Sequence, residues 1–215
     1  MKVSEKSLEL NVGAELLAMM RGNWGLPKAY LRGLTQAEEK QEGVDFFAQL
    51  SPTARLFAFQ FKAPKGRWDG APYRYTLVIE QHELLFSLAQ VSADAVFYVF
   101  PFYVTAAKLQ QDVPNLSQDT WLLRIAGMPT AAVFNGQRTK VVSCSPGTAL
   151  INPTYRLEKL DDLRQDREAS GIQAGAFAAW YERHLGAVRE DGRHRNPWLV
   201  RGLRLVVVGS SSRSG

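Results

Sequence analysis

Apolar residues recur at helical spacing near the start of the chain. Leu8, Val12, Leu16 and Met20 lie four residues apart, which places them along one face of a helix. The pattern predicts a helix over residues 5–21. A loop punctuated by glycine and proline is expected to follow, over residues 22–34.

Two apolar runs come next and carry the signal of a β-hairpin. Residues 44–50 and 55–62 are rich in Phe, Leu and Ala, and the four residues between them, "SPTA", are typical of a turn. We therefore expect two paired strands. The residues after the second strand, 63–72, are expected to form an exposed basic loop.

The next segments indicate a helix between strands. Residues 73–80 alternate as a strand does, or lead into the following helix, and residues 80–90 have leucines at helical spacing. Residues 95–102 are a nearly continuous apolar run interrupted by Pro101. Such a run is typical of a buried central strand.

The second half of the chain has weaker patterns. Residues 105–112 suggest a short helix, and residues 120–129 and 140–147 suggest strands or buried turns. Charged residues interleaved with apolar ones predict two helices over residues 155–190, broken near Ser170.

These elements predict an α/β fold in three parts. Residues 1–155 are expected to form an α/β domain with a mixed β-sheet flanked by helices. Residues 156–209 are expected to add a helical C-terminal extension and a terminal strand that pack on it. Residues 210–215, which are mostly serine, are expected to form a flexible tail.

Composition narrows the class of protein. The chain has 215 residues, of which 46% are hydrophobic and 11% aromatic, and this composition is that of a globular protein with a core. The apolar runs are too short to span a bilayer, and the N-terminal residues are too polar for a signal peptide. A single cysteine, Cys144, excludes an intramolecular disulfide. We expect a cytoplasmic protein, and the net charge of +5 is compatible with an anionic partner.

Polar side chains mark the ends of the two hairpin strands. Asp45 lies at the start of the first strand, and Gln60 and Lys62 lie two residues apart at the end of the second. The start of one hairpin strand lies beside the end of the next, so the three side chains should meet. The alternative is structural, with Asp45 as a strand cap and Lys62 as a solvated strand end.

The three side chains supply what hydrolysis of a phosphodiester requires. A hard divalent cation prefers oxygen ligands, such as a carboxylate and an amide carbonyl. The cation polarises the phosphate and lowers the pKa of a bound water. A nearby lysine can stabilise the negative charge that develops in the transition state.

An Asp on one strand followed by Gln-x-Lys on the next, in "GVDFFAQL" and "FQFK", resembles the PD-(D/E)XK nuclease superfamily. The resemblance covers residues 5–102 and is nearest to the branch in which Gln replaces the second acid, as in Mrr-type restriction enzymes and several phage-defence effectors. It implies a restriction-endonuclease-like fold and cleavage of nucleic acid, DNA above all, with Mg²⁺ or Mn²⁺ as cofactor. It also implies a role in host defence.

The resemblance assigns roles to individual residues. Asp45 and Gln60 would bind the metal, Lys62 would be catalytic, and a helix would supply a further acid. Glu15 is our first choice for that acid because of its place on the N-terminal helix. Glu38 and Glu39 are the alternatives.

Two departures from the family pattern affect the expected metal site. Val44 stands where the superfamily often has a proline, and Gln60 carries no charge where most members have an acid. Weaker metal binding is therefore expected. A non-catalytic nucleic-acid-binding or structural subunit of a defence complex, with a nuclease-like fold, is the alternative function.

Basic and aromatic residues cluster after the second hairpin strand. Cations bind phosphate and aromatic rings stack on bases, so the cluster predicts contacts with nucleic acid, although a solvated loop would have the same composition. A chain of this length has little room for a sensor of its own, so we also expect a homo-oligomer or a partner protein. The predicted nucleic-acid-binding residues are Lys65, Arg67, Trp68 and Arg74.

Overall fold

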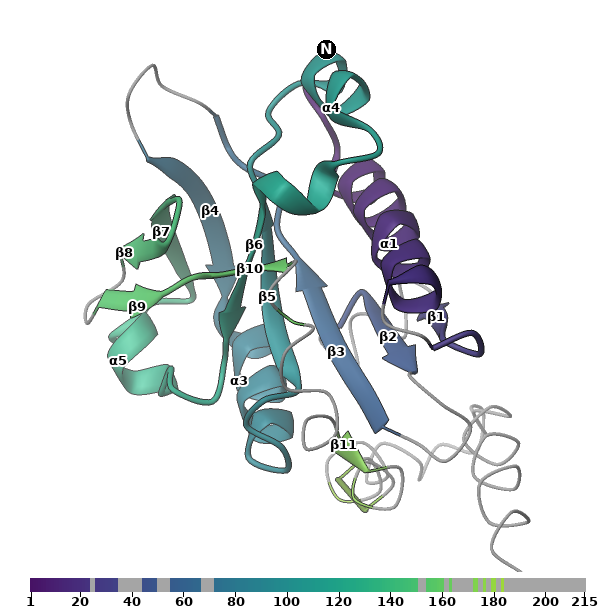
Figure 1. The fold of residues 1–215 in the computed structure, drawn as a ribbon. Helices are drawn as coiled ribbons and strands as arrows, with labels where there is room; N and C mark the ends of the chain where they lie inside the picture. Colours follow the sequence, from purple (N-terminus) through teal and green to yellow (C-terminus); the bar gives the residue numbers. More distant parts are fainter. Residues whose placement is uncertain are drawn as a thin grey trace, which may run out of the picture.

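The structure is a computed structural model that describes most of the first 160 residues. They form a mixed α/β fold with two β-sheets and flanking helices (Figure 1). The described residues are 1–23, 26–34, 44–49, 55–66, 72–150, 154–160, 163, 172–173, 176, 179–180 and 183.

The larger sheet has seven strands and holds the candidate site. Its pairs are antiparallel, except that β3 and β5 run parallel. In the order β1-β2-β3-β5-β6-β10, with β11 also pairing with β3, the strands are β1 (Tyr30–Gly33), β2 (Phe46–Gln49), β3 (Arg55–Phe61), β5 (Val96–Pro101), β6 (Thr120–Arg124), β10 (Glu158–Lys159) and β11 (Ile172–Gln173).

Helix α1 (Glu5–Gly22) lies against this sheet (Figure 1). It begins at the N-cap residue Ser4, whose hydroxyl accepts a hydrogen bond from the Ser7 N–H, as capping serines commonly do. Its buried stripe contains Leu8, Val12 and Leu16. The burial of this stripe holds α1 in place, since an isolated helix gains little stability from propensity alone.

Helix α3 (Ile79–Ala89) lies in the crossover that makes β3 and β5 parallel. Parallel neighbours cannot be joined by a tight turn, so the chain must leave the sheet and return. It does so through β4 (Tyr73–Val78) and then α3. Strand β5, where it returns, is buried at every position, as expected for a strand covered on both faces.

A second, four-stranded sheet packs against the first. All its strand pairs are antiparallel. Aromatic rings pack between the two sheets: the ring centroids of Tyr75 and Phe100 are 4.6 Å apart, and those of Tyr73 and Phe102 are 4.5 Å apart. In order, its strands are β4, β7 (Thr139–Ser145), β8 (Thr148–Leu150) and β9 (Thr154–Arg156).

Three short helical elements complete the described fold. They are α4 (Ala106–Asp112), the 3₁₀ helix η1 (Leu116–Asp119) and α5 (Thr130–Phe134). η1 packs against α1, and α5 packs against α3. None of the helices in the described ranges is long and apolar enough to cross a bilayer.

The structure confirms the elements with strong local patterns. Helix α1, the β2–β3 hairpin, α3 and the buried strand β5 lie where the sequence predicts them, and α4 and strands β6 and β7 also form. The α/β class is therefore correct.

Two predictions of secondary structure are wrong. The loop predicted over residues 22–34 contains β1, which pairs with β2. The helix predicted from residue 155 is replaced there by β9 and β10. β1 and β10 are short strands stabilised by the partners β2 and β6, which are distant in sequence and which local periodicity does not reveal.

The predicted helical extension over 156–209 is thus partly sheet. β10 and β11 belong to the seven-stranded sheet, and Trp180 is buried with its indole N–H donating to the Ser87 hydroxyl. Most of residues 161–215, the predicted tail over 210–215 included, lies outside the described residues.

Candidate functional site

The β2–β3 register brings Asp45 to Gln60. Phe46 lies opposite Phe59 in the hairpin, so the next step along both strands pairs Asp45 with Gln60. The Asp45 N–H donates to the Phe59 carbonyl at 3.0 Å. The predicted meeting of Asp45 and Gln60 at the open end of the hairpin is therefore confirmed.

The Asp45 carboxylate is buried and accepts two hydrogen bonds at one oxygen. Oδ2 accepts from the Gln60 Nε2 at 2.7 Å and from the Phe61 N–H. Burial raises the pKa of this carboxyl to about 7, although Lys62 and the Phe61 N–H act to lower it. Glu5 and Glu9 raise the pKa further by repulsion, so two more acids lie in the electrostatic neighbourhood of Asp45.

Lys62 reaches the site from the end of β3 and is held by α3. Its Nζ donates to the Gln81 Oε1 at 2.6 Å. Burial lowers the pKa of the ammonium, while Glu5 and Asp45 act in the opposite direction. A buried ammonium with fixed partners is positioned in advance, which is what electrostatic stabilisation of a transition state requires.

Gln60 leaves one polar atom without a partner. Its Nε2 donates to the Asp45 carboxylate and to the Phe61 carbonyl, at 2.7 and 3.1 Å. Its Oε1 is buried and has no hydrogen-bond partner among the described residues. An unpaired buried amide oxygen costs free energy, and a hard cation would satisfy it.

The acids beside the hairpin come from α1 and are Glu5 and Glu9. They lie one helical turn apart, and therefore on the same face. The Glu5 Oε2 accepts from the Ala63 N–H at 2.9 Å, and Lys6 donates to both oxygens of Glu9 at 2.8 and 2.9 Å. Neither acid was predicted from the sequence. The available signal was Glu9 itself, an acid within the buried stripe that contains Val12 and Leu16.

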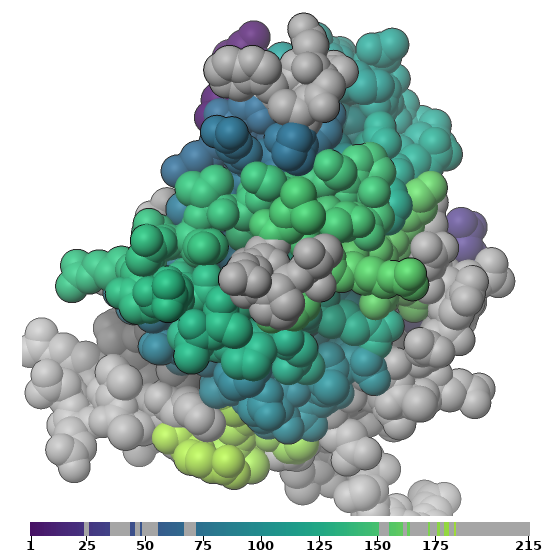
Figure 2. Space-filling view, turned by 90° about the vertical axis from the view of Figure 1, so that its left-hand side faces the viewer, coloured from purple at the N-terminus to yellow at the C-terminus, as the bar shows by residue number. Residues whose placement is uncertain are grey.

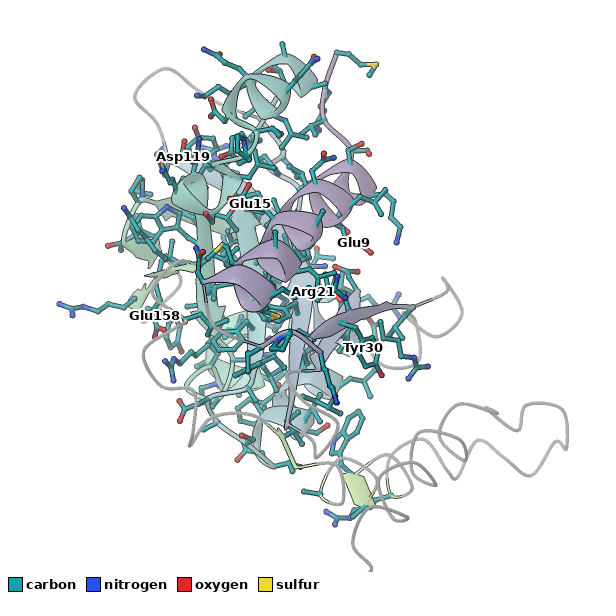
Figure 3. The ribbon with its side chains drawn as sticks, turned by 45° about the vertical axis from the view of Figure 1, so that its right-hand side comes forward. Glu9, Glu15, Arg21, Tyr30, Asp119 and Glu158 are labelled. Carbon is teal, nitrogen blue, oxygen red and sulfur yellow. The ribbon has the colours of Figure 1, made fainter. Side chains whose placement is uncertain are left out.

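Glu15, our first choice for the helical acid, binds the start of η1 instead of the hairpin site. Its two oxygens accept the N–H groups of Leu116 and Ser117 at 2.7 and 2.8 Å, at the start of η1. Figure 3 shows Glu9 and Glu15 on different sides of α1. A six-residue separation turns a side chain well away from the earlier one, because an α-helix has 3.6 residues per turn. The alternatives Glu38 and Glu39 lie outside the described residues.

The described cavity lies on the Glu15 side of α1 and away from Asp45. It is an open groove of about 680 Å³ between α1 and η1. Neither Asp45, Gln60 nor Lys62 lines it. These three residues are instead only 6%, 1% and 7% exposed.

The oxygen atoms near Asp45 are of the type that a hard cation prefers. Three carboxylates, those of Glu5, Glu9 and Asp45, face two lysines, Lys6 and Lys62, so negative groups are in excess. All the possible ligand atoms are oxygens, the type that Mg²⁺ and Mn²⁺ prefer. No group of three or more His, Cys, Asp or Glu side chains within the described ranges forms a metal site by itself. The Gln60 oxygen or water would therefore have to complete the coordination.

Two of the four predicted nucleic-acid-binding residues can be placed. Lys65 and Arg74 are both exposed, and the Lys65 N–H donates to the Arg74 carbonyl at 2.7 Å. This bond joins the end of the hairpin to the start of β4. Arg67 and Trp68 lie outside the described residues.

The buried histidine of α3 packs in the core. His82 is fully buried, with Nε2 at 2.8 Å from the Met128 carbonyl and Nδ1 at 3.1 Å from the Tyr98 hydroxyl. The first contact requires a proton on Nε2, so Nδ1 accepts from Tyr98. Burial lowers the pKa of this imidazole. Cys144 is likewise buried, and burial raises the pKa of its thiol to about 12, so it is a poor nucleophile.

The chain matches no protein-family model, curated protein or solved structure. A functional interpretation therefore depends on the side chains themselves.

Proposed function

We propose that this protein is a metal-dependent nuclease that cleaves DNA, with its active site at the open end of the β2–β3 hairpin. The observation that supports this most is the meeting of Asp45, Gln60 and Lys62 with two acids of α1. Carboxylates, an unpaired amide oxygen and a fixed lysine are together the groups that phosphodiester hydrolysis needs.

The chain's own residues would act in two ways. Asp45, Glu9 and the Gln60 Oε1 would hold Mg²⁺ or Mn²⁺, which when bound supplies Lewis-acid polarisation and an activated water. Lys62, held by Gln81, would stabilise charge on the phosphate oxygens. Glu5 is exposed at the edge of the site, where it can contribute a further oxygen.

We also propose that the fold is restriction-endonuclease-like. The helix, strand pair, helix and strand that the resemblance implies have counterparts in α1, β2–β3, α3 and β5. β1 and β4 are additions to that order. A role in host defence stays a prediction, and so does assembly into an oligomer or with a partner protein. A protein that is a monomer by light scattering and cleaves DNA unaided would contradict the predicted assembly.

Nicking of a supercoiled plasmid in Mg²⁺ or Mn²⁺ tests the nuclease activity. We expect nicked or linear products that disappear when a chelator is added, because the proposed reaction depends on the metal to activate water. Single-stranded DNA and RNA oligonucleotides should be assayed in parallel. Failure to cleave any of these substrates would contradict the proposal.

A non-catalytic nucleic-acid-binding protein is the second candidate. The observation in its favour is the absence of a group of three acids, histidines or cysteines at a metal site in the described part of the chain. A thermal melt with millimolar Mg²⁺ or Mn²⁺ separates the two, because a ligand at 100 times its Kd stabilises by about 2.7 kcal/mol. Retained nucleic-acid binding without any shift by metal would favour this second function.

A further inference from the structure

The four-stranded sheet has one face turned away from the larger sheet. Residues alternate between faces along a strand, and Tyr75, Leu77, Val142, Cys144 and Ala149 are buried on the inner face. The residues between them form the outer face. Figure 2 shows the side of the molecule on which β7 to β9 lie, in green. We call it the outer sheet face; it consists of Arg74, Thr76, Val78, Thr139, Val141, Ser143, Ser145, Thr148, Leu150 and Arg156.

Charge on this face is all of one sign. The four strands contain no Asp or Glu. Arg74 and Arg156 are exposed, and exposed Lys65 and Arg138 flank the sheet. Their side chains make no hydrogen bond or ion pair with the part of the chain that the structure describes. Four exposed cations whose side chains pair with no acid among the described residues are available to an anionic partner.

The uncharged side chains on this face include several hydroxyl groups. Ser143 lies opposite Arg74 on β4 and Leu150 on β8, and Thr148 lies opposite Arg156 on β9. Serine, threonine and arginine are among the side chains that commonly contact phosphate oxygens in nucleic-acid complexes.

A backbone hydrogen bond connects the outer sheet face to the segment that follows the hairpin site. Lys65 follows Lys62 by three residues, a span of at most about 11 Å, and its N–H is bonded to the Arg74 carbonyl. A nucleic acid that reaches Lys62 is therefore brought to the first exposed arginine of the sheet.

We propose that the outer sheet face binds the phosphate backbone of a nucleic-acid duplex whose scissile phosphate lies at the hairpin site. The inference rests on the proposed function and adds to it the surface that holds the substrate. A duplex fits better than a single strand, because no exposed aromatic ring lies on the described part of this face and single strands are held largely by stacking. The exposed aliphatics Val78, Val141 and Leu150 are separate residues of the size normal for a protein surface.

The test is a pair of double variants of the full chain, measured by fluorescence anisotropy with duplex DNA, duplex RNA and single-stranded DNA in EDTA. V141E/L150E places two carboxylates on the outer sheet face, one on β7 opposite Thr76 and one on β8 opposite Ser143, at positions that are each 52% exposed. We expect duplex binding to weaken at least about tenfold, because the added charges oppose the phosphates. Circular dichroism and the melting temperature should match wild type.

A18E/V113E is the matched control. It changes the net charge by the same amount at exposed positions in the groove between α1 and η1, away from the outer sheet face. Its Kd should stay within about threefold of wild type. Equal weakening by both double variants would overturn the proposal.

Salt dependence gives an independent measure that does not require new charges. R74Q/R156Q should reduce the slope of log K against log salt by about two, since each phosphate contact contributes about 0.9. An unchanged slope would overturn the proposal, as would an effect of V141E/L150E on self-association alone. A preference for duplex DNA or duplex RNA identifies the source of the phosphates, and preference for the single strand counts against the proposal.

The outcomes separate this surface from the catalytic proposal. Weakened binding by V141E/L150E without cleavage by wild type in Mg²⁺ would support the surface and contradict the nuclease activity. Cleavage by wild type together with unchanged binding by the variants would support the nuclease activity and contradict the binding surface.

Discussion

Two groups of acidic side chains beside α1, which we call the Glu15 corner and the Asp45 corner, differ in what satisfies their charge. At the Glu15 corner, both carboxylate oxygens accept backbone N–H groups from the start of η1. At the Asp45 corner, Glu5, Glu9 and Asp45 lie together with two lysines, and the Gln60 oxygen has no partner among the described residues.

The difference separates a structural acid from a candidate functional one. Glu15 satisfies the orphan N–H groups that every helix start leaves, so its role is complete within the fold. The Asp45 corner collects more negative groups than its two lysines balance. Asp45 and Glu9 are buried, and a buried carboxylate costs free energy unless it is paired or compensated, which is why we place the function there.

The largest expected effect is on cleavage by Asp45→Asn and Lys62→Met. The amide in Asp45→Asn can still accept from Gln60 and Phe61 but loses the charge that holds the metal, and the thioether in Lys62→Met keeps an unbranched chain without the ammonium. We expect each to lower the rate by about a hundred- to a thousandfold. Plasmid nicking in Mg²⁺ or Mn²⁺ measures this.

Folding and binding provide the controls for these two variants. Circular dichroism and oligonucleotide affinity should stay near wild type, because phosphate binding is spread over many cations. Cleavage at the wild-type rate by either variant would remove that residue from the mechanism.

Glu9→Gln and Glu15→Gln test whether the first acid acts in cleavage and the second in stability. Glu9→Gln should lower cleavage by about ten- to a hundredfold with little loss of stability. Glu15→Gln should leave cleavage unchanged but lower the free energy of unfolding by about 1–3 kcal/mol, because one backbone N–H loses its acceptor. Rates and urea midpoints for both variants decide between them.

A reversed pattern would exchange the roles of the two acids. If Glu15→Gln lost cleavage and Glu9→Gln only stability, the active site would have to lie on the η1 side of α1.

A smaller effect is expected when Lys62 loses its support. Gln81→Leu removes the acceptor for the Lys62 ammonium, and a hydrogen bond to a charged group contributes about 1.5–3 kcal/mol. We expect about a tenfold fall in the cleavage rate, less than for Lys62→Met. Glu83→Gln, an exposed change on the same helix, is the control and should have no effect.

The smallest effect is on stability at low pH, through His82. Its pKa is lowered by burial, so the unfolded chain binds a proton more readily than the folded one. The free energy of unfolding should therefore fall as pH decreases below about 6.5, the ordinary imidazole value. Above that pH both states are neutral and His82 contributes nothing to the pH dependence.

His82→Gln isolates this contribution. The difference in urea midpoint between wild type and His82→Gln should change between about pH 7.5 and 5.5, with wild type losing more. A constant difference would show that His82 does not titrate between these values.

The hairpin and its three polar residues were predictable because they depend on short-range relations. Strand alternation and a four-residue turn define β2 and β3, and hairpin connection then requires Asp45 to meet Gln60. Helix α1 was predictable for the same reason, since its buried stripe repeats at helical spacing.

The short strands could not be predicted in this way. β1 has four residues and β10 has two, too few for a periodicity to appear. They form because β2 and β6 offer unpaired backbone groups, and those partners are known only once the sheet is assembled.

The sequence by itself determined the α/β class, the helix and hairpin at the start, and the three residues at the open end of that hairpin. Only the tertiary structure decided which acids of α1 join them and which residue of α3 holds Lys62. The reason is that register fixes contacts along a hairpin, whereas the rotation of a helix against a sheet depends on the packing of the whole buried face. That packing directs Glu9 to Asp45 and leaves Glu15 to cap η1.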